Sequence, residues 1–151
     1  MEVSYRRIDF GNEAESRFVA EADSRIPLEY DSHYTFTATS IDQRLKYYQE
    51  FKADDFFDVA VDGERVVGFH AVHIIPYPPD LRVGNIATLW VAPDYRKKGI
   101  GHQLKTRAEI WGREKKLAFL QTNVHTNNKT MLAINEAAGF ETAYINLRKR
   151  L

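Results

Sequence analysis

Apolar and polar positions follow two different periods along this chain, and each period predicts one kind of element. Apolar residues three or four apart predict helices, whereas alternation or short apolar runs between turn residues predict strands. The helical period occurs in residues 14–22, 41–52, 101–115 and 128–138. The strand pattern occurs in residues 3–9, 56–61, 65–75, 85–91, 119–124 and 141–147. The expected order is therefore β-α-α-β-β-β-α-β-α-β.

Cap and turn residues indicate where several of these elements begin and end. Asn12 with Glu15, and Ser40 with Gln43, are patterns that favour helix N-termini. Asp62-Gly63 between two strand-like runs is a strong hairpin signal. Three prolines predict a loop over residues 75–84, and residues 26–39 lack periodicity and are also expected to form a loop.

The order of these elements predicts a mixed sheet. Strands and helices alternate over residues 85–147, which favours parallel pairing there. The hairpin in the middle of the chain requires antiparallel pairing. The fold class is therefore α/β with an α+β character. The chain has 151 residues, a length typical of one domain, and we expect a single domain over residues 1–151.

Charge and composition narrow the class of protein. Lys plus Arg equals 21 and so does Asp plus Glu, so the chain lacks the basic excess of a general nucleic-acid binder. There are no cysteines, which removes disulfides, thiolate metal sites and cysteine nucleophiles. The charged start and the lack of a run of about 18 apolar residues argue against a signal peptide and a membrane span. We expect a cytoplasmic protein with no nucleic-acid and no membrane partner.

The segment with the clearest chemistry is Arg96-Lys97-Lys98-Gly99-Ile100-Gly101. It lies between an expected strand and an expected helix, and a helix start leaves backbone N–H groups free to bind an anion. The two glycines allow close approach of backbone to phosphates, and three basic side chains add positive charge. The segment has neither the Gly-Lys-Ser/Thr of a Walker loop nor a dinucleotide Gly-x-Gly-x-x-Gly.

Two motifs together resemble the GCN5-related N-acetyltransferase (GNAT) family. The first is Arg96-x-x-Gly99-x-Gly101 after Val91-x-Pro93, and the second is Asn128-x-x-Met131, which continues to Gly139-Phe140. The resemblance spans nearly the whole chain. It implies the acyl-CoA N-acyltransferase fold, a splayed central sheet of about six to seven strands with helices on both faces. Homodimers are frequent among such proteins, so a homodimer is one possible oligomeric state of this chain.

The same resemblance implies acetyl-CoA as the co-substrate. The backbone of residues 89–91 would pair with the pantetheine arm in the gap of the sheet, and the loop 96–101 would hold the pyrophosphate. The implied cofactor-binding residues are Leu89, Trp90, Val91, Arg96, Lys97, Lys98, Gly99, Ile100, Gly101 and Asn128.

The family's usual acid and base positions hold other residues in this chain. Ala87 and Thr88 stand where a Glu is frequent, Asn123 stands at a second Glu position, and Asn135 replaces the Tyr that protonates the leaving thiolate. An asparagine cannot act as a base, but its amide can donate to a thiolate or hold a water. Asn135 and Asn123 are therefore the catalytic candidates, with water or a histidine relaying the proton.

The expected activity is transfer of an acetyl group to a primary amine of a small molecule, amino acid or peptide. A non-catalytic acyl-CoA-binding module of the same fold is the alternative, since the usual Glu and Tyr are missing. His70 and His73 are expected on opposite faces of one strand because their spacing is odd. No pair of histidines has the spacing of a helical metal site, so we expect no metal.

Overall fold

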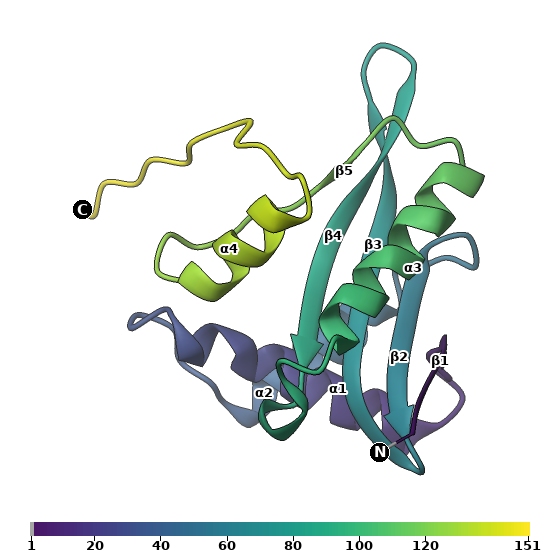
Figure 1. Cartoon of the computed structure of the whole chain (residues 1–151). Helices are drawn as coiled ribbons and strands as arrows, with labels where there is room; N and C mark the ends of the chain where they lie inside the picture. The colour runs from purple at the N-terminus through teal and green to yellow at the C-terminus, as the bar shows by residue number, and fades with distance from the viewer. Residues whose placement is uncertain (1) are drawn as a thin grey trace.

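A computed structural model describes residues 2–151 (Figure 1). The strands are β1 (Val3–Arg7), β2 (Phe56–Asp62), β3 (Arg65–Tyr77), β4 (Leu81–Val91) and β5 (Leu120–Gln121). The helices are α1 (Glu13–Arg25), α2 (Ala38–Tyr48), α3 (Ile100–Glu114) and α4 (Lys129–Ala137), with short 3-10 turns at Ile26–Glu29 and Pro93–Tyr95. Within residues 2–151, no helix has both the length and the apolar character needed to cross a membrane.

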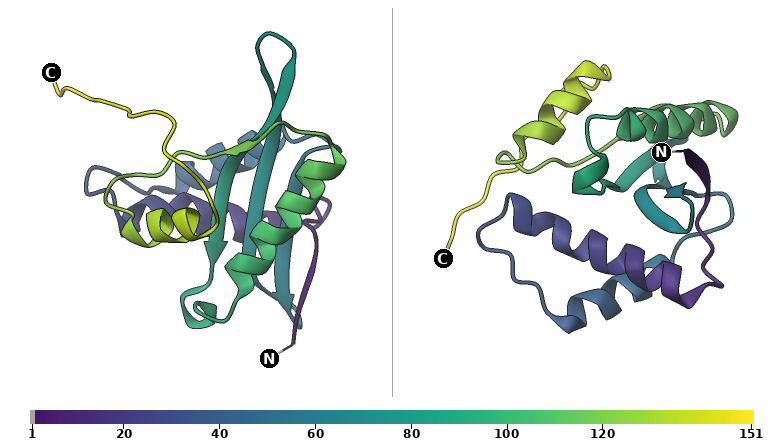
Figure 2. Two further views of the ribbon diagram at one scale, coloured as in Figure 1. Left: turned by 45° about the horizontal axis from the view of Figure 1, so that its top comes forward. Right: turned by 60° about the horizontal axis from the view of Figure 1, so that its bottom comes forward.

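The five strands form one mixed sheet in the order β1-β2-β3-β4-β5. The first four are antiparallel neighbours, and β5 runs parallel to β4, as the alternation of strands and helices predicted. Figure 2 shows α1 and α2 on one face of the sheet and α3 on the other. The layered mixed α/β architecture with helices on both faces is therefore confirmed.

Apolar side chains fill both sides of the sheet. Phe57, Val59 and Phe69 face α1 and α2, where Val19 and Tyr48 pack against them. On the other face, a second group made of Ala60, Val67, Ile100 and Leu104 fixes α3 over the sheet. Burial of each large apolar side chain contributes roughly 1.5–3 kcal/mol. The sheet is thus held rigidly between two helical layers.

The number of strands differs from the prediction, because over residues 2–151 the sheet has five strands and not six to seven. The expected last strand, residues 141–147, pairs with no strand within residues 2–151 and is irregular. Its large apolar side chains stay in solvent, with Tyr144 80% and Leu147 87% exposed. Alternation of residues gives a segment two faces, but a strand forms only where a neighbouring edge supplies hydrogen bonds.

The loop expected over residues 75–84 is mostly strand. β3 and β4 pair as far as Tyr77 and Leu81, with Pro76 opposite Arg82. A proline removes one ladder donor but leaves its carbonyl, so it is tolerated where a hairpin runs beyond the other strands. Figure 1 shows this hairpin projecting past the rest of the sheet.

The cap and turn residues in the sequence predicted most helix ends and the β2–β3 turn to within a few residues. The Asn12 side chain accepts a hydrogen bond from Glu15 N, as its pattern predicted. In contrast, α2 begins earlier than expected, with a capping box made by Thr37 and Ser40. The β2–β3 turn consists of the two residues between Asp62 and Arg65, and Gly63 alone has positive φ there.

The feature that positions the site is the divergence of β4 from β5. The two strands pair only at Gly84 with Leu120 and at Asn85 with Gln121. From Ile86 to Val91, the edge of β4 that faces away from β3 has no strand beside it in the described part of the chain. A β-bulge opposite Ala71 and Val72 leaves Ala87 without a register partner at the point of divergence. Apart from the Val91 carbonyl, which accepts a hydrogen bond from Arg96, the backbone groups on this edge are thus available to another molecule.

Candidate active site

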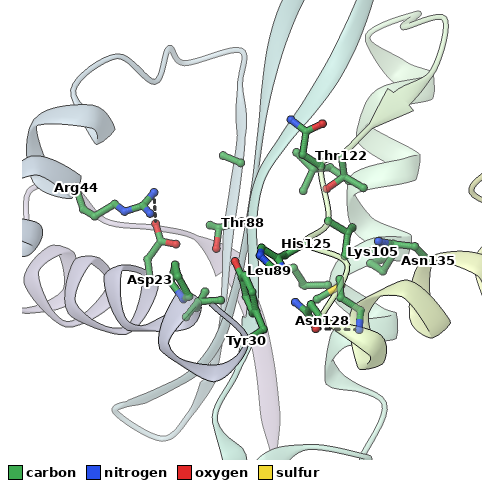
Figure 3. Close-up of a pocket in the computed structure, with 17 residues that line it drawn as sticks. Asp23, Tyr30, Arg44, Thr88, Leu89, Lys105, Thr122, His125, Asn128 and Asn135 are labelled. Carbon is green, nitrogen blue, oxygen red and sulfur yellow. Dashed lines mark hydrogen bonds and ion pairs between the residues drawn. The ribbon is translucent and has the colours of Figure 1, made fainter. Parts of the chain in front are cut away.

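A cavity of about 130 Å³ lies where β4 and β5 part, with room for several water molecules (Figure 3). One wall comes from α1, α2 and the turn after α1, and the other from α3, α4 and the segment that follows β5. The bulged part of β4 lies between them. Figure 3 shows Asp23 and Arg44 on one side, with Lys105 and Asn135 on the other. The residues that line the cavity include Asp23, Tyr30, Arg44, Thr88, Leu89, Lys105, Asn123, His125, Asn128 and Asn135.

The start of α3 forms a cradle of free backbone N–H groups. The first helical hydrogen bond runs from Gln103 N to the Gly99 carbonyl oxygen at 3.0 Å, so the N–H groups of residues 100–102 have no partner within the helix. Lys97 and Gly99 have φ of 61° and 84°, so the loop that leads into α3 turns twice through the left-handed region. A Cβ at Gly99 would meet nothing within 4 Å, so the space before the helix is open.

The basic side chains of this loop point in different directions. Arg96 donates to the Val91 carbonyl and to Glu29, both at 2.9 Å, and so ties the loop to the turn after α1. The Lys98 ammonium lies 5.3 Å from the centre of the Tyr95 ring. Lys97 is exposed. Three basic residues thus come directly before the cradle, although Arg96 is already paired with a carboxylate.

The three predicted positions on β4 differ in what they present to the cavity. The Leu89 side chain lines it, while the Trp90 ring stacks on Phe69 at 5.1 Å in the core behind the strand. The Val91 carbonyl lies on the free edge and is already occupied, because it accepts a hydrogen bond from Arg96. The Trp90 carbonyl oxygen also lies on the β3 side of the strand, 3.1 Å from where a Cβ at Gly68 would stand.

The predicted asparagines meet at the cavity although they lie on different elements. Asn123 follows β5, Asn128 is the N-cap of α4 and accepts from Met131 N at 3.2 Å, and Asn135 lies on α4. Asn135 is 6% exposed, and its Oδ1 accepts a hydrogen bond from Lys105 Nζ at 2.8 Å. The structure thus brings together every asparagine that the sequence singled out as a site residue.

The carboxylate of Asp23 also borders this cavity, and sequence reasoning missed it. Asp23 is 3% exposed and accepts a hydrogen bond from the Tyr48 hydroxyl at 2.7 Å, with Arg44 at 3.7 Å. Burial raises the pKa of Asp23, and Arg44, Tyr48 and Thr88 oppose that shift. Nothing near Asp23 in the sequence marks it, because its partners lie on α2 and β4.

Lys105 on α3 is the second residue that sequence reasoning missed. Its side chain is almost fully buried, and burial lowers the pKa of its ammonium. A signal was present, since Gly101, Ala108 and Gly112 share its helix face and are all small or apolar. A lysine on the inward face of an amphipathic helix is uncommon and marks the position for attention.

The histidines divide as their spacing predicted. His70 faces α3, with Nδ1–H donating to the Thr88 carbonyl at 2.9 Å, and burial lowers its pKa to about 4. His73 lies on the other face against Phe51 and Asp55. His125 borders the cavity with its ring 5.2 Å from that of Tyr30. Among residues 2–151, no group of three or more His, Cys, Asp or Glu side chains is arranged to hold a metal ion.

Comparison with known proteins adds independent findings. The family model described as "Acetyltransferase (GNAT) family" matches residues 17–140. Aminoglycoside N(6')-acetyltransferase type 1 of Klebsiella aerogenes is 34% identical over 85 residues, which cover 54% of this chain and 55% of that protein. The match therefore spans about half the length of this curated relative.

Solved structures share the fold at lower identity. A putative acetyl transferase from Pyrococcus furiosus superposes with a TM-score of 0.79 at 17% identity, covering 99% of this chain and 100% of the other. The NatC complex bound to Gag peptide and CoA gives 0.74 at 19% identity, covering 95% and 87%. At these identities, both similarities show that the fold is shared and nothing more.

Proposed function

Because this chain belongs to the Acetyltransferase (GNAT) family, we propose that it is an enzyme that transfers an acetyl group from acetyl-CoA to a primary amine. The acceptor class is a small molecule, amino acid or peptide that presents a cationic amine. The observation that carries the proposal is one cavity that borders both the free edge of β4 and the buried carboxylate of Asp23.

The residues on the cofactor side have the chemistry that coenzyme A requires. Free N–H groups at residues 100–102, with Lys97 and Lys98 nearby, suit a pyrophosphate. The backbone groups that residues 89–91 present at the unpaired edge suit the amide groups of a pantetheine arm. In this proposal Leu89, Trp90, Val91, Arg96, Lys97, Lys98, Gly99, Ile100, Gly101 and Asn128 bind the co-substrate.

The opposite wall suits the acceptor. Asp23 holds the ammonium of the incoming amine and takes its proton, because a buried carboxylate favours a partner of opposite charge. A backbone N–H near Val91 polarises the thioester carbonyl. Asn123 and Asn135 hold water or donate to the leaving sulfur. The 6'-amine in the name of the Klebsiella aerogenes relative is an acceptor of this class and the first to assay.

A thermal melt with and without acetyl-CoA tests the binding part of this proposal. At about 100 times the dissociation constant, a ligand stabilises the folded state by about 2.7 kcal/mol, so the midpoint should rise by roughly 5–10 °C. Gly101→Glu places a carboxylate at the cradle and should abolish the rise. Gly101→Ala is the matched control and should keep most of it, because its Cβ would lie 3.6 Å from Val91 Cγ2, an ordinary contact.

Release of free coenzyme A in the presence of amines tests turnover. The panel contains an aminoglycoside with a free 6'-amine, a polyamine, free amino acids and a short peptide. A melt shift without coenzyme A release above background for any amine would identify a non-catalytic acyl-CoA-binding module. No melt shift up to millimolar acetyl-CoA would disprove the acetyltransferase proposal.

A further inference from the structure

Lys105 carries a positive charge into the cavity without a carboxylate to balance it. The residue is 6% exposed. Within residues 2–151, its ammonium has one hydrogen-bond acceptor, Asn135 Oδ1 at 2.8 Å, and lies 4.6 Å from the centre of the Phe140 ring. An ammonium has three donors, so the remaining N–H groups are available to another molecule.

Burial of this ammonium is costly for the fold. A charge removed from water costs several kcal/mol unless an opposite charge lies close, and an amide oxygen with an aromatic face compensates only in part. The acidic group that acts on Lys105 is Glu109, one turn further along α3, whose side chain is 36% exposed and lies 3.9 Å from Arg113. The structure therefore keeps an only partly compensated cation on the inward face of α3.

The position of Lys105 connects it to the proposed chemistry. It lies about one turn beyond the cradle on α3, because it is four positions after Gly101 and each position adds about 1.5 Å along the helix axis. It borders the cavity together with Leu89 and Asn135 (Figure 3). A thioester with its phosphates at the cradle and its arm along β4 would bring its sulfur into this cavity. The charge that develops there during acyl transfer is the negative charge on the leaving sulfur.

We propose that Lys105 is the proton donor to the leaving thiol, held in place by Asn135. This inference rests on the proposed acetyltransferase function. The amine nitrogen bonds to the carbonyl carbon, the carbon–sulfur bond breaks, and its electron pair leaves on sulfur. Lys105 Nζ gives one proton to that sulfur. The acceptor's ammonium loses two protons to water through Asp23, and one proton from water restores Lys105, so each turnover releases one proton.

The groups around Lys105 favour this role over the histidines. His70 on β3 faces Lys105, and the two positive charges would repel each other. Because His70 is buried with a pKa of about 4, it is uncharged near neutral pH. Burial lowers the pKa of Lys105 toward the range in which a thiol titrates, and Glu109 opposes that shift. The other ionisable groups that line the cavity are Asp23, Arg44 and the Tyr30 phenol across from Lys105, and His125 on the same wall as Lys105.

A titration of the bound coenzyme A thiol tests the inference without an acceptor. The chain has no cysteine, so coenzyme A carries the thiol that titrates in the complex. The complex with desulfo-coenzyme A gives the blank, which removes the absorbance of ionising tyrosines. An ammonium within about 4–6 Å lowers the pKa of an anionic group by about one to three units. We expect a thiol pKa lowered by that amount in the complex relative to free coenzyme A. An unshifted or raised thiol pKa in the wild-type complex would overturn the inference.

Variants assign the shift to Lys105. Lys105→Met should return the thiol pKa to that of free coenzyme A or above and should keep the melt shift with coenzyme A. Lys115→Met, at the exposed end of α3, removes the same charge and should leave the thiol pKa lowered. His125→Asn should also leave it lowered. A shift that follows His125 or survives in Lys105→Met would contradict the inference.

Kinetics complete the test once an amine is found. Lys105→Met should lower kcat by about 10²-fold or more with little change in the KM for acetyl-CoA. Wild-type kcat should fall as the pH rises through the lowered pKa of Lys105, and the variant should lack this decline. If Lys105→Met were active with the kcat and the pH profile of the wild type, only the role of Lys105 would be disproved. An inactive wild type would instead count against the proposed function.

Discussion

At the scale of single residues, the site depends on two buried charges that stand on opposite walls of one cavity. Asp23 comes from α1 and Lys105 from α3, and each is almost fully buried. Burial raises the pKa of Asp23 and lowers that of Lys105, so both pKa values move toward neutrality. Proton transfer is most efficient when the pKa of the acid or base lies near the working pH.

Replacement of Asp23 by asparagine should separate catalysis from folding. Asn keeps the shape of the side chain and an oxygen for the Tyr48 hydroxyl, but it has no charge for an ammonium. We expect kcat/KM for an amine acceptor to fall by about 10²-fold or more, while the acetyl-CoA melt shift stays. Coenzyme A release and thermal melts measure the two effects.

The matched control is Asp42→Asn on α2, whose carboxylate is exposed and lies 3.7 Å from Arg17. It should change neither the turnover nor the melting midpoint by a measurable amount. If Asp23→Asn retained full kcat/KM, the carboxylate would have no part in acceptor binding or proton removal.

At the scale of elements, the pairing of β4 with β5 decides whether the cavity exists. Gly84 lies at the start of this pairing, where a Cβ would come within 2.5 Å of Leu120 Cδ2 and 2.9 Å of Val72 Cγ1. The valine has little freedom to move because its side chain is branched at Cβ. Only glycine lets β5 lie this close before the two strands diverge.

We therefore expect Gly84→Ala to destabilise the protein by about 1–3 kcal/mol, as overpacking of a core usually does. Urea denaturation monitored by far-ultraviolet circular dichroism gives the free energy of unfolding. Gly112→Ala is the control, because its Cβ would lie 3.4 Å from the same Leu120 atom, in ordinary contact. That change should be neutral or stabilising by up to about 1 kcal/mol, since alanine favours a helix over glycine. The reverse order of the two variants would contradict this account of the junction.

The sequence predicted local features well and long-range features poorly. The loop at residues 96–101 is a local pattern, so its place between a strand and a helix was correct. Pro76 misled the prediction, because its tolerance depends on the exposed hairpin around it. Residues 141–147 gave the opposite error, a predicted strand where none forms, because alternating apolar residues do not supply a partner strand. The partners of Asp23 lie on α2 and β4, and those of Lys105 lie on and after α4, so neither role was visible in nearby residues.

At the scale of the whole molecule, stability should depend on pH through His70. Its pKa falls from 6.5 in the unfolded chain to about 4 in the folded protein, so the unfolded chain binds the extra proton between these values. The contribution of neutral His70 is complete above pH 6.5 and is lost as the pH falls toward 4. The loss in unfolding free energy should be on the order of 3 kcal/mol.

Urea denaturation at several pH values measures this dependence. His70→Asn is the comparison, because its amide nitrogen can take the place of Nδ1 against the Thr88 carbonyl and does not titrate in this range. The difference in slope between the two proteins isolates His70 from carboxylates such as Glu15, whose pKa is lowered by Arg6. Parallel slopes in the two proteins would mean that His70 is not held neutral by the fold.

The two walls of the cavity come from separate stretches of the chain. Asp23, Tyr30 and Arg44 lie within the first 50 residues, whereas the cradle, Lys105 and the asparagines all follow residue 95. If the proposed function holds, selection on acceptor choice can act on one part of the gene while the other part keeps the proposed site for the acetyl donor. On the proposed function, a chimaera that carries residues 12–50 of another family member should take that protein's acceptor preference and show the same melt shift with acetyl-CoA as this chain.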